Sequence, residues 1–168
     1  MINFKRKQNR SEKNSAKIFM KAIEELRKKT SKYYRTDHTD KQTKEEILEF
    51  QQAQTILEEK VRQDDIKNNF MSFVKTMWPE FIEGKHHKEI AEKFNKIAQG
   101  KSKRLIINMP PRHTKSEFAS FLLPAWMVGR KPDLKIIQTT HTTELALRFG
   151  RKAKTLIDSP EYQKIFNT

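Results

Sequence analysis

Apolar residues recur every three or four positions in the first half of the chain, which is the spacing of one face of a helix. A first run lies among lysines and arginines and predicts a short basic helix over residues 15–29. Residues 30–43 are polar and show no sustained period, so we expect a linker there. A second run predicts a long amphipathic helix within residues 44–69, with Thr43 as its N-cap and Glu46 as the capping-box partner. The apolar positions of this second run are Ile47, Phe50, Ala53, Leu57 and Val61.

Apolar and aromatic residues become dense after residue 69, where we expect a compact domain over residues 70–168 to begin. The pattern predicts a helix or helix pair over residues 70–82, interrupted near Pro79 because proline disrupts a helix. A further helix is expected over residues 87–99. Gly100 follows it directly and is expected to end it, since glycine adopts the left-handed backbone of that position at little cost.

Two short runs rich in β-branched residues predict buried strands, RLIINM at residues 104–109 and LKIIQTT at residues 134–140. Each run is followed by a helical pattern, over residues 115–128 and 142–157 respectively. Strand, helix, strand and helix in this order imply parallel strands joined by right-handed crossovers, which is an α/β fold. The side chains of the last helix that we expect to face inward are Leu145, Leu147, Phe149 and Ala153.

Composition limits the size of the core and the range of chemistry. The 168 residues are 35% hydrophobic, below the roughly 45–50% of typical globular chains, so we expect a modest core. Lysine and arginine exceed aspartate and glutamate by 35 to 21, a net charge of +14, with an excess both in residues 1–43 and in residues 70–168. The chain has no cysteine, which excludes disulfides, cysteine zinc sites and a thiol nucleophile. Uncharged stretches are too short to cross a bilayer, so we expect a soluble, cytosolic protein without a membrane partner.

The segment with the clearest chemistry is RLIINMPPRHTKSEF, in which a predicted strand enters a tight turn and Lys115 and Ser116 open the next helix. Amides at a helix start, a mobile lysine charge and an adjacent hydroxyl suit phosphate and Mg²⁺ binding. The usual pattern, G-x-x-x-x-G-K-[ST], would place glycines at Met109 and Thr114, and neither is glycine. An ordinary basic turn with a helix-opening Lys-Ser pair is the alternative reading.

A wider set of motifs surrounds that turn. The chain reads HHKEIAEKF before it, PPRHTKS within it, and LPAWMVGRKPDLKIIQTTH and TTELALRFGRKAKTLIDSPEYQKIF after it. Together these closely resemble the ATPase domain of tailed-bacteriophage terminase large subunits, the motors that package DNA into preformed heads. The resemblance covers residues 70–168. In that family the turn commonly reads PPR-x-[GT]-KS, so the missing glycines depart from the general pattern and not from the family.

The resemblance implies an incomplete P-loop ATPase core of the ASCE type, with parallel strands, preceded by a basic helical N-terminal region. It implies ATP and Mg²⁺ as cofactors, with Lys115 on the β- and γ-phosphates and Ser116 on the metal ion. The amides of Arg112, His113, Thr114 and Lys115 would wrap the phosphates. Arg112 would act in catalysis by stabilising charge on the γ-phosphate. A solvent-facing arginine is the alternative for Arg112, and a solvated loop histidine for His113.

The hydrolytic half of such an ATPase is not recognisable in the sequence. No apolar strand ending in Asp-Glu is present, and no nuclease cluster follows, so we expect the N-terminal part of a terminase large subunit, truncated before those motifs. We therefore expect weak nucleotide binding, essentially no turnover and an unpaired sheet edge. Should turnover occur, the carboxylates to test first are Glu117, Glu144 and Asp158.

Partners and alternatives follow from charge and family. The resemblance implies double-stranded DNA, the terminase small subunit and the portal protein as partners, in the cytoplasm of an infected or lysogenic bacterial host. The basic arm suits contact with the DNA backbone, and contact with a protein partner is the competing interpretation. Two other functions stay open: a non-enzymatic basic module that binds DNA or a partner, and a helicase-like P-loop fragment.

Four large side chains outside the turn have structural interpretations. His86 and His87 precede a predicted helix, and we expect them to serve as capping or packing residues. Trp78 and Trp126 lie among apolar residues at helical spacing, which predicts packing in the core or at its edge.

Overall fold

The computed structural model describes residues 21, 24, 25, 28 and 41–166. The chain divides into two units, residues 1–62 and 63–168, and helix α2 (Lys41–Asn68) crosses the boundary between them. Most of the predicted basic helix at residues 15–29 and of the linker at residues 30–43 lies outside the described residues. The four described positions of that basic helix are helical and exposed.

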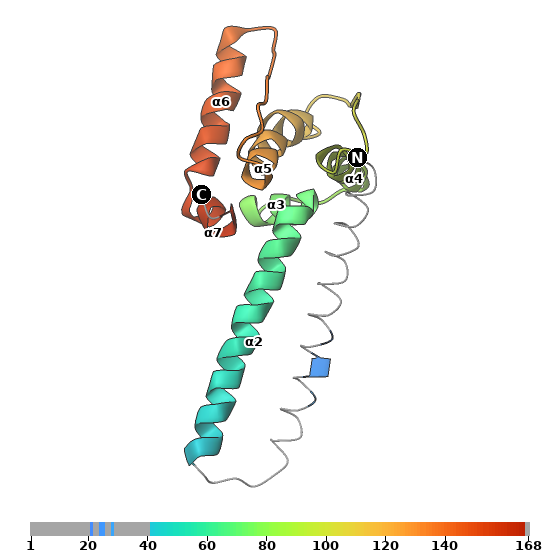
Figure 1. Ribbon diagram of the computed structural model, residues 1–168. Helices are drawn as coiled ribbons and strands as arrows, with labels where there is room; N and C mark the ends of the chain where they lie inside the picture. The colour runs from blue at the N-terminus through green and yellow to red at the C-terminus, as the bar shows by residue number, and fades with distance from the viewer. Residues whose placement is uncertain (1–20, 22–23, 26–27, 29–40, 167–168) are drawn as a thin grey trace. The chain divides into compact units, whose positions relative to one another are not determined.

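Helices account for all the regular structure in residues 41–166 (Figure 1). No strand occurs among the residues that the structure describes, so the predicted α/β core with parallel strands is wrong. After α2 the elements are α3 (Phe70–Met77), α4 (Lys85–Ala98), the π-helix η1 (Glu117–Leu122), α5 (Leu123–Arg130), α6 (Thr143–Ile157) and α7 (Pro160–Phe166).

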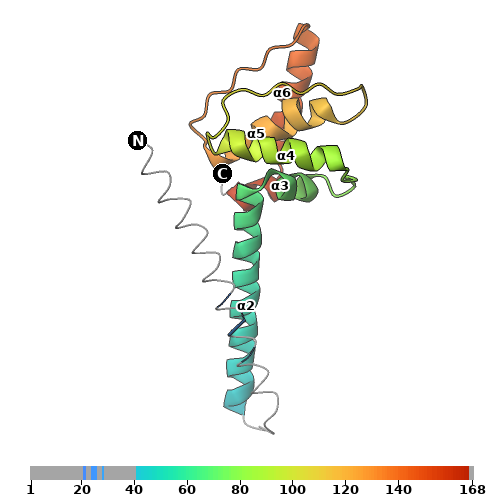
Figure 2. The same ribbon diagram turned by 90° about the vertical axis from the view of Figure 1, so that its right-hand side faces the viewer.

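The two predicted strands, residues 104–109 and 134–140, are irregular, and we call them the isoleucine segments. Figure 2 shows the stretches that contain them as open traces between helices. A strand is stable only beside a neighbour that accepts and donates its backbone hydrogen bonds. Neither segment has a ladder of this kind, and Ile106 and Ile137 are 94% and 91% exposed. Their β-branched composition alone therefore did not produce a sheet.

The predicted helices are largely confirmed. Helix α2 begins at Lys41, before the expected cap at Thr43, and α3 ends at Met77, ahead of Pro79. Gly100 has a φ of 69°, the left-handed backbone expected of it. The helix predicted at residue 115 does begin there, but it passes through the π-helix η1 before α5.

Two details at the end of the chain differ from the prediction. Phe149 of α6 is buried, as expected, but Leu147 is 53% exposed, so its inward orientation was wrong. Helix α7 was not predicted, although it buries three side chains. They are Tyr162, Ile165 and Phe166.

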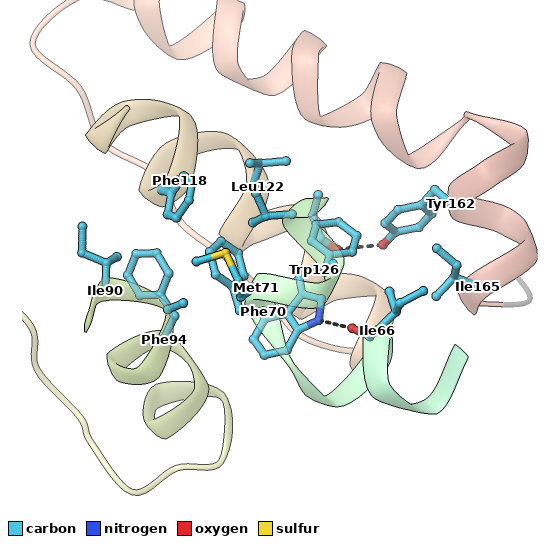
Figure 3. Packing of buried hydrophobic residues seen from close by; sticks show 14 of the residues in the cluster. Ile66, Phe70, Met71, Ile90, Phe94, Phe118, Leu122, Trp126, Tyr162 and Ile165 are labelled. Carbon is cyan, nitrogen blue, oxygen red and sulfur yellow. Dashed lines mark hydrogen bonds between the residues drawn. The ribbon is translucent and has the colours of Figure 1, made fainter. Parts of the chain in front are cut away.

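An aromatic cluster fills the interior of residues 63–168 (Figure 3). Phe70 lies at its centre, with its ring centroid 5.1 Å from Phe94, 5.5 Å from Phe118 and 5.4 Å from Trp126. These edge-to-face contacts add to the burial of apolar area. The predicted packing role of Trp126 is confirmed, since it is fully buried, and Trp78 packs against the cluster.

Three hydrogen bonds tie the helices of this cluster together. The Trp126 indole Nε1–H donates to the carbonyl of Ile66 at 3.1 Å, and the Tyr162 hydroxyl donates to the carbonyl of Ala125 at 2.7 Å (Figure 3). The Phe70 amide donates to Asn95 Oδ1 at 2.9 Å, which joins the start of α3 to α4. Each bond satisfies a polar group that would otherwise be costly to bury.

None of the helices in the described part of the chain is long and apolar enough to span a membrane.

Candidate phosphate-binding loop

The loop PPRHTKS, residues 110–116, connects the first isoleucine segment to the helix that contains η1. Lys115 and Ser116 form the first helical residues, as predicted. The fully buried Phe118 follows them closely and packs into the aromatic cluster. The end of the loop is therefore anchored to the core, while residues 110–113 are exposed.

The backbone of this loop has an uncommon conformation. Arg112 and Thr114 have φ angles of 65° and 56°, the two positive values for residues other than glycine in the described chain. A left-handed backbone costs a residue with a Cβ roughly 1–2 kcal/mol, and Thr is β-branched, which adds to the difficulty. Thr114 occupies the position where the usual phosphate-loop pattern has glycine.

The sign of φ alternates along the loop, positive at Arg112 and Thr114 and negative at His113 and Lys115. An alternation of left-handed and right-handed residues turns successive amide N–H groups toward one side and forms an anion-binding concavity called a nest. The four amides that the resemblance implies for phosphate wrapping, those of residues 112–115, belong to this alternating stretch.

The side chains of the loop differ in exposure. Lys115 is half-buried, and its Nζ donates to the carbonyl of Met109 at 3.4 Å, across the base of the loop. Ser116 is exposed, and its backbone is already helical, with φ −70° and ψ −35°. Arg112 is exposed to solvent, which is compatible both with a role toward a phosphate and with its alternative as a surface arginine.

The histidines lie beside the loop. His87 Nδ1 accepts from the amide of Gly84 at 2.9 Å, at the start of α4, which confirms the predicted capping role. His87 Nε2 lies 2.7 Å from the hydroxyl oxygen of Thr114. Its ring is buried, and this burial, with the nearby charge of His86 second, lowers the pKa of His87. His113 is exposed, and its Nδ1 donates to the carbonyl of Pro111 at 2.9 Å.

The link between His87 and Thr114 was missed by sequence reasoning. The two residues are 27 positions apart, and neither local periodicity nor the phosphate-loop pattern pairs them. The one local signal was the position of His87, three residues after Gly84 at the start of a helix.

The three carboxylates singled out for a hydrolytic role are not gathered at one site. Glu117 forms an ion pair with Lys152, whose ammonium also lies 4.5 Å from the centroid of the Phe121 ring. Glu144 is in the first turn of α6 and Asp158 caps its other end, about 20 Å away at 1.5 Å per residue. Among the described residues, no group of three or more His, Asp or Glu side chains is placed to hold a metal ion.

The loop therefore combines backbone amides, one lysine charge and one hydroxyl, and groups of these kinds are suited to a phosphate and its Mg²⁺ ion. In comparisons with protein-family models, with curated proteins and with solved structures, no match to this chain was found.

Proposed function

We propose that this chain is the ATP-binding portion of a viral DNA-packaging motor, of the terminase large-subunit kind, with residues 110–116 as its phosphate loop. The observation that carries the proposal is the alternating sign of φ in that loop, immediately before Lys115 and Ser116, because alternating left-handed and right-handed residues form anion-binding concavities. In the complete motor, ATP would drive DNA into the prohead. The site of action would be the cytoplasm of an infected or lysogenic bacterial host.

Each loop residue has a defined part in this proposal. The amides of residues 112–115 donate to phosphate oxygens, and the ammonium group of Lys115 exchanges the Met109 carbonyl for the outer phosphates. The Ser116 hydroxyl is a ligand of Mg²⁺, which supplies charge neutralisation on those phosphates. The Arg112 guanidinium, exposed beside them, stabilises negative charge on the γ-phosphate.

Backbone strain supports the proposal independently of the motif. Unfavourable left-handed residues persist where the surrounding structure holds them, and they cluster at ligand-binding sites. Two of them occur here within three residues of each other, in a loop next to a lysine and a helix start. The common type I turn contains neither of them.

Substitution of Lys115 tests the proposal directly. We expect Lys115→Ala to weaken binding of ATP·Mg²⁺ by about 10- to 100-fold, because it removes a charge-assisted hydrogen bond and the attraction of the ammonium group. Isothermal titration calorimetry measures the loss, and circular dichroism shows that the variant is folded. Lys131→Ala, an exposed lysine after α5, is the matched control and should bind as the wild type does. Equal affinity in Lys115→Ala and the wild type would refute the phosphate-loop assignment.

A second function, a basic module that binds nucleic acid or a partner without nucleotide, is favoured by the net charge of +14 and the 35% hydrophobic content. Filter binding to duplex DNA at two salt concentrations, with and without ATP, separates the two. Contacts to the DNA backbone weaken steeply with salt. Tight, salt-sensitive binding that is indifferent to ATP and to Lys115→Ala supports the module.

A further inference from the structure

We propose that His87 is a positioning residue for the phosphate loop: its neutral ring holds Thr114 in the left-handed backbone, and protonation of the ring releases the loop. The contact with Thr114 is a property of the fold, whereas its consequence for nucleotide affinity rests on the function proposed above. The experiments below therefore include a readout without nucleotide.

The hydrogen-bond partners of His87 define where its proton lies. The Gly84 amide donates to Nδ1, so Nδ1 carries the lone pair and Nε2 carries the ring proton. Nε2–H then donates to the Thr114 hydroxyl oxygen at 2.7 Å, and that hydroxyl donates to the carbonyl of His113, also at 2.7 Å. Each donor in this series of hydrogen bonds therefore has one acceptor. Only the neutral Nε2–H tautomer of His87 can make both of its bonds.

The ring itself is firmly placed. His87 is 6% exposed, and its ring packs against two aromatic rings, Phe81 at 4.8 Å and Phe118 at 5.1 Å between centroids. Phe118 belongs to the helix that begins at the loop. The His87 ring therefore contacts this helix as well as Thr114 in the loop. A fixed donor at the Thr114 side chain opposes rotation of a backbone that threonine does not favour.

Protonation of His87 breaks this arrangement for a geometric reason. A second proton on Nδ1 would face the Gly84 amide hydrogen across 2.9 Å, two donors without an acceptor. The ring would have to move or the amide to turn away. Either change displaces Nε2 from Thr114, and the left-handed backbone loses its side-chain support.

The charges around His87 set the direction of its response to pH. Burial, the largest effect, lowers its pKa from the ordinary 6.5, and His86, whose ring centroid is 3.8 Å away, and His113 lower it further. Glu83 acts in the opposite sense but is paired with Lys75 at 2.7 Å. The other groups packed against the ring, Phe81 and Phe118, do not titrate. The support of the loop is therefore complete above pH 6.5 and is lost as the pH falls through the lowered value.

Nuclear magnetic resonance of the ligand-free, full chain tests the contact itself. Long-range ¹⁵N–¹H spectra should show His87 in the Nε2–H form at neutral pH, and the amide resonances of Thr114 and Lys115 should titrate with a midpoint below pH 6.5. In His87→Phe, which keeps an aromatic ring for packing, that titration should be absent. An Nδ1–H tautomer, or an equal titration in the variant, would overturn the proposal.

A double-mutant cycle tests the consequence for binding. His87→Phe should weaken ATP·Mg²⁺ binding about 3- to 10-fold, the effect of one lost hydrogen bond. Glycine adopts the left-handed backbone without support, so in a Thr114→Gly background the same change should cost less than about 2-fold. Thr114→Val should reproduce the loss from His87→Phe, and Thr114→Ser should restore affinity.

The outcomes separate the two proposals. Equal losses from His87→Phe in the Thr114 and Thr114→Gly backgrounds would show that the ring acts through general packing, and the positioning role would be wrong. Absence of ATP·Mg²⁺ binding by the wild type would refute the proposed function, while the ligand-free spectra would still decide the contact.

Discussion

The aromatic cluster and the isoleucine segments contain similarly apolar residues, but single isoleucines in the two regions differ widely in exposure. Ile165, in α7, is 5% exposed, whereas Ile137, in the second isoleucine segment, is 91% exposed. Both are isoleucine, so the difference lies in the backbone that carries them. A helix satisfies its own hydrogen bonds and needs only a neighbouring side-chain surface, whereas an extended segment also needs a neighbouring strand.

The comparison shows that apolar character alone does not specify burial. In the core, the amide of Phe70 donates to the side chain of Asn95. Each isoleucine segment has one comparable bond to the helix that contains η1: Lys115 Nζ donates to the carbonyl of Met109 at 3.4 Å, and Gln138 Nε2 donates to the carbonyl of Ser120 at 3.1 Å. One side-chain bond attaches a segment to a helix, but it does not replace a ladder of backbone bonds.

The largest expected effect comes from truncating the same residue type in the two regions. Ile165→Ala should lower the free energy of unfolding by about 2–5 kcal/mol, because it leaves a cavity in the aromatic cluster. Ile137→Ala should change it by less than about 0.5 kcal/mol, because the side chain of Ile137 is already exposed to solvent. Urea denaturation followed by circular dichroism measures both values. A loss above about 1 kcal/mol for Ile137→Ala would show that this side chain is packed and would contradict the difference in burial between the two regions.

The next effect concerns Tyr162, at the centre of the helical region. Burial raises its pKa to about 12 from the ordinary 10.0. The folded state therefore disfavours tyrosinate. The contribution of Tyr162 to the free energy of unfolding is fully present below pH 10 and is lost as the pH rises toward 12. The shift corresponds to about 2–3 kcal/mol. The free energy of unfolding, measured between pH 9 and 12, should fall more steeply with pH in the wild type than in Tyr162→Phe. The same slope in both proteins would exclude Tyr162 as its source.

A smaller effect distinguishes covered and open faces within the helices themselves. A Cβ at Gly129 of α5 would lie 2.5 Å from the Tyr162 hydroxyl and 2.7 Å from Phe166, whereas a Cβ at Gly150 of α6 would meet nothing within 4 Å. Gly129→Ala should destabilise the fold by about 1–3 kcal/mol through overpacking. Gly150→Ala should stabilise it by about 0.5–1 kcal/mol through helix propensity. Thermal unfolding compares the two, and a similar change in both would mean that α5 is not close-packed.

The helices were predicted well where apolar residues recur at helical spacing along one face. Phe70, Phe73 and Val74 follow helical spacing, and all three are buried in α3. The π-helix was not predictable from this spacing, since its apolar residues also suit an ordinary helix. The wrong prediction of strands at the isoleucine segments has a different cause. A strand depends on pairing with another strand, which can lie anywhere in the chain.

The start of helix α7 has a local sequence signal that the predictions did not use. Asp158 is the C-cap of α6, and Ser159 and Pro160 follow it directly. The Ser159 hydroxyl accepts from the amide of Tyr162 at 3.4 Å and so caps α7. Pro160 is well tolerated in a first helical turn.

The candidate site was predictable in part. Lys115 and Ser116 do open a helix, and the motif located the turn correctly. The left-handed backbone of Thr114 could not be inferred from its own residue type, which disfavours it. The bond from His87 depends on how α4 approaches the loop, a property of tertiary packing with no local pattern.

The π-helix η1 accommodates one extra residue between the loop and the end of α5. The amide of Leu123 donates to the carbonyl of Phe118, five residues back, so this turn holds one residue more than an α turn. Deleting one residue between them would restore the four-residue spacing of an α turn. Phe118 would stay directed at the core and Lys115 and Ser116 at their present side of the molecule, because the extra residue bulges from the helix without changing the direction of its flanks. The π turn is thus a place where this helix can lose one residue while the loop keeps its direction.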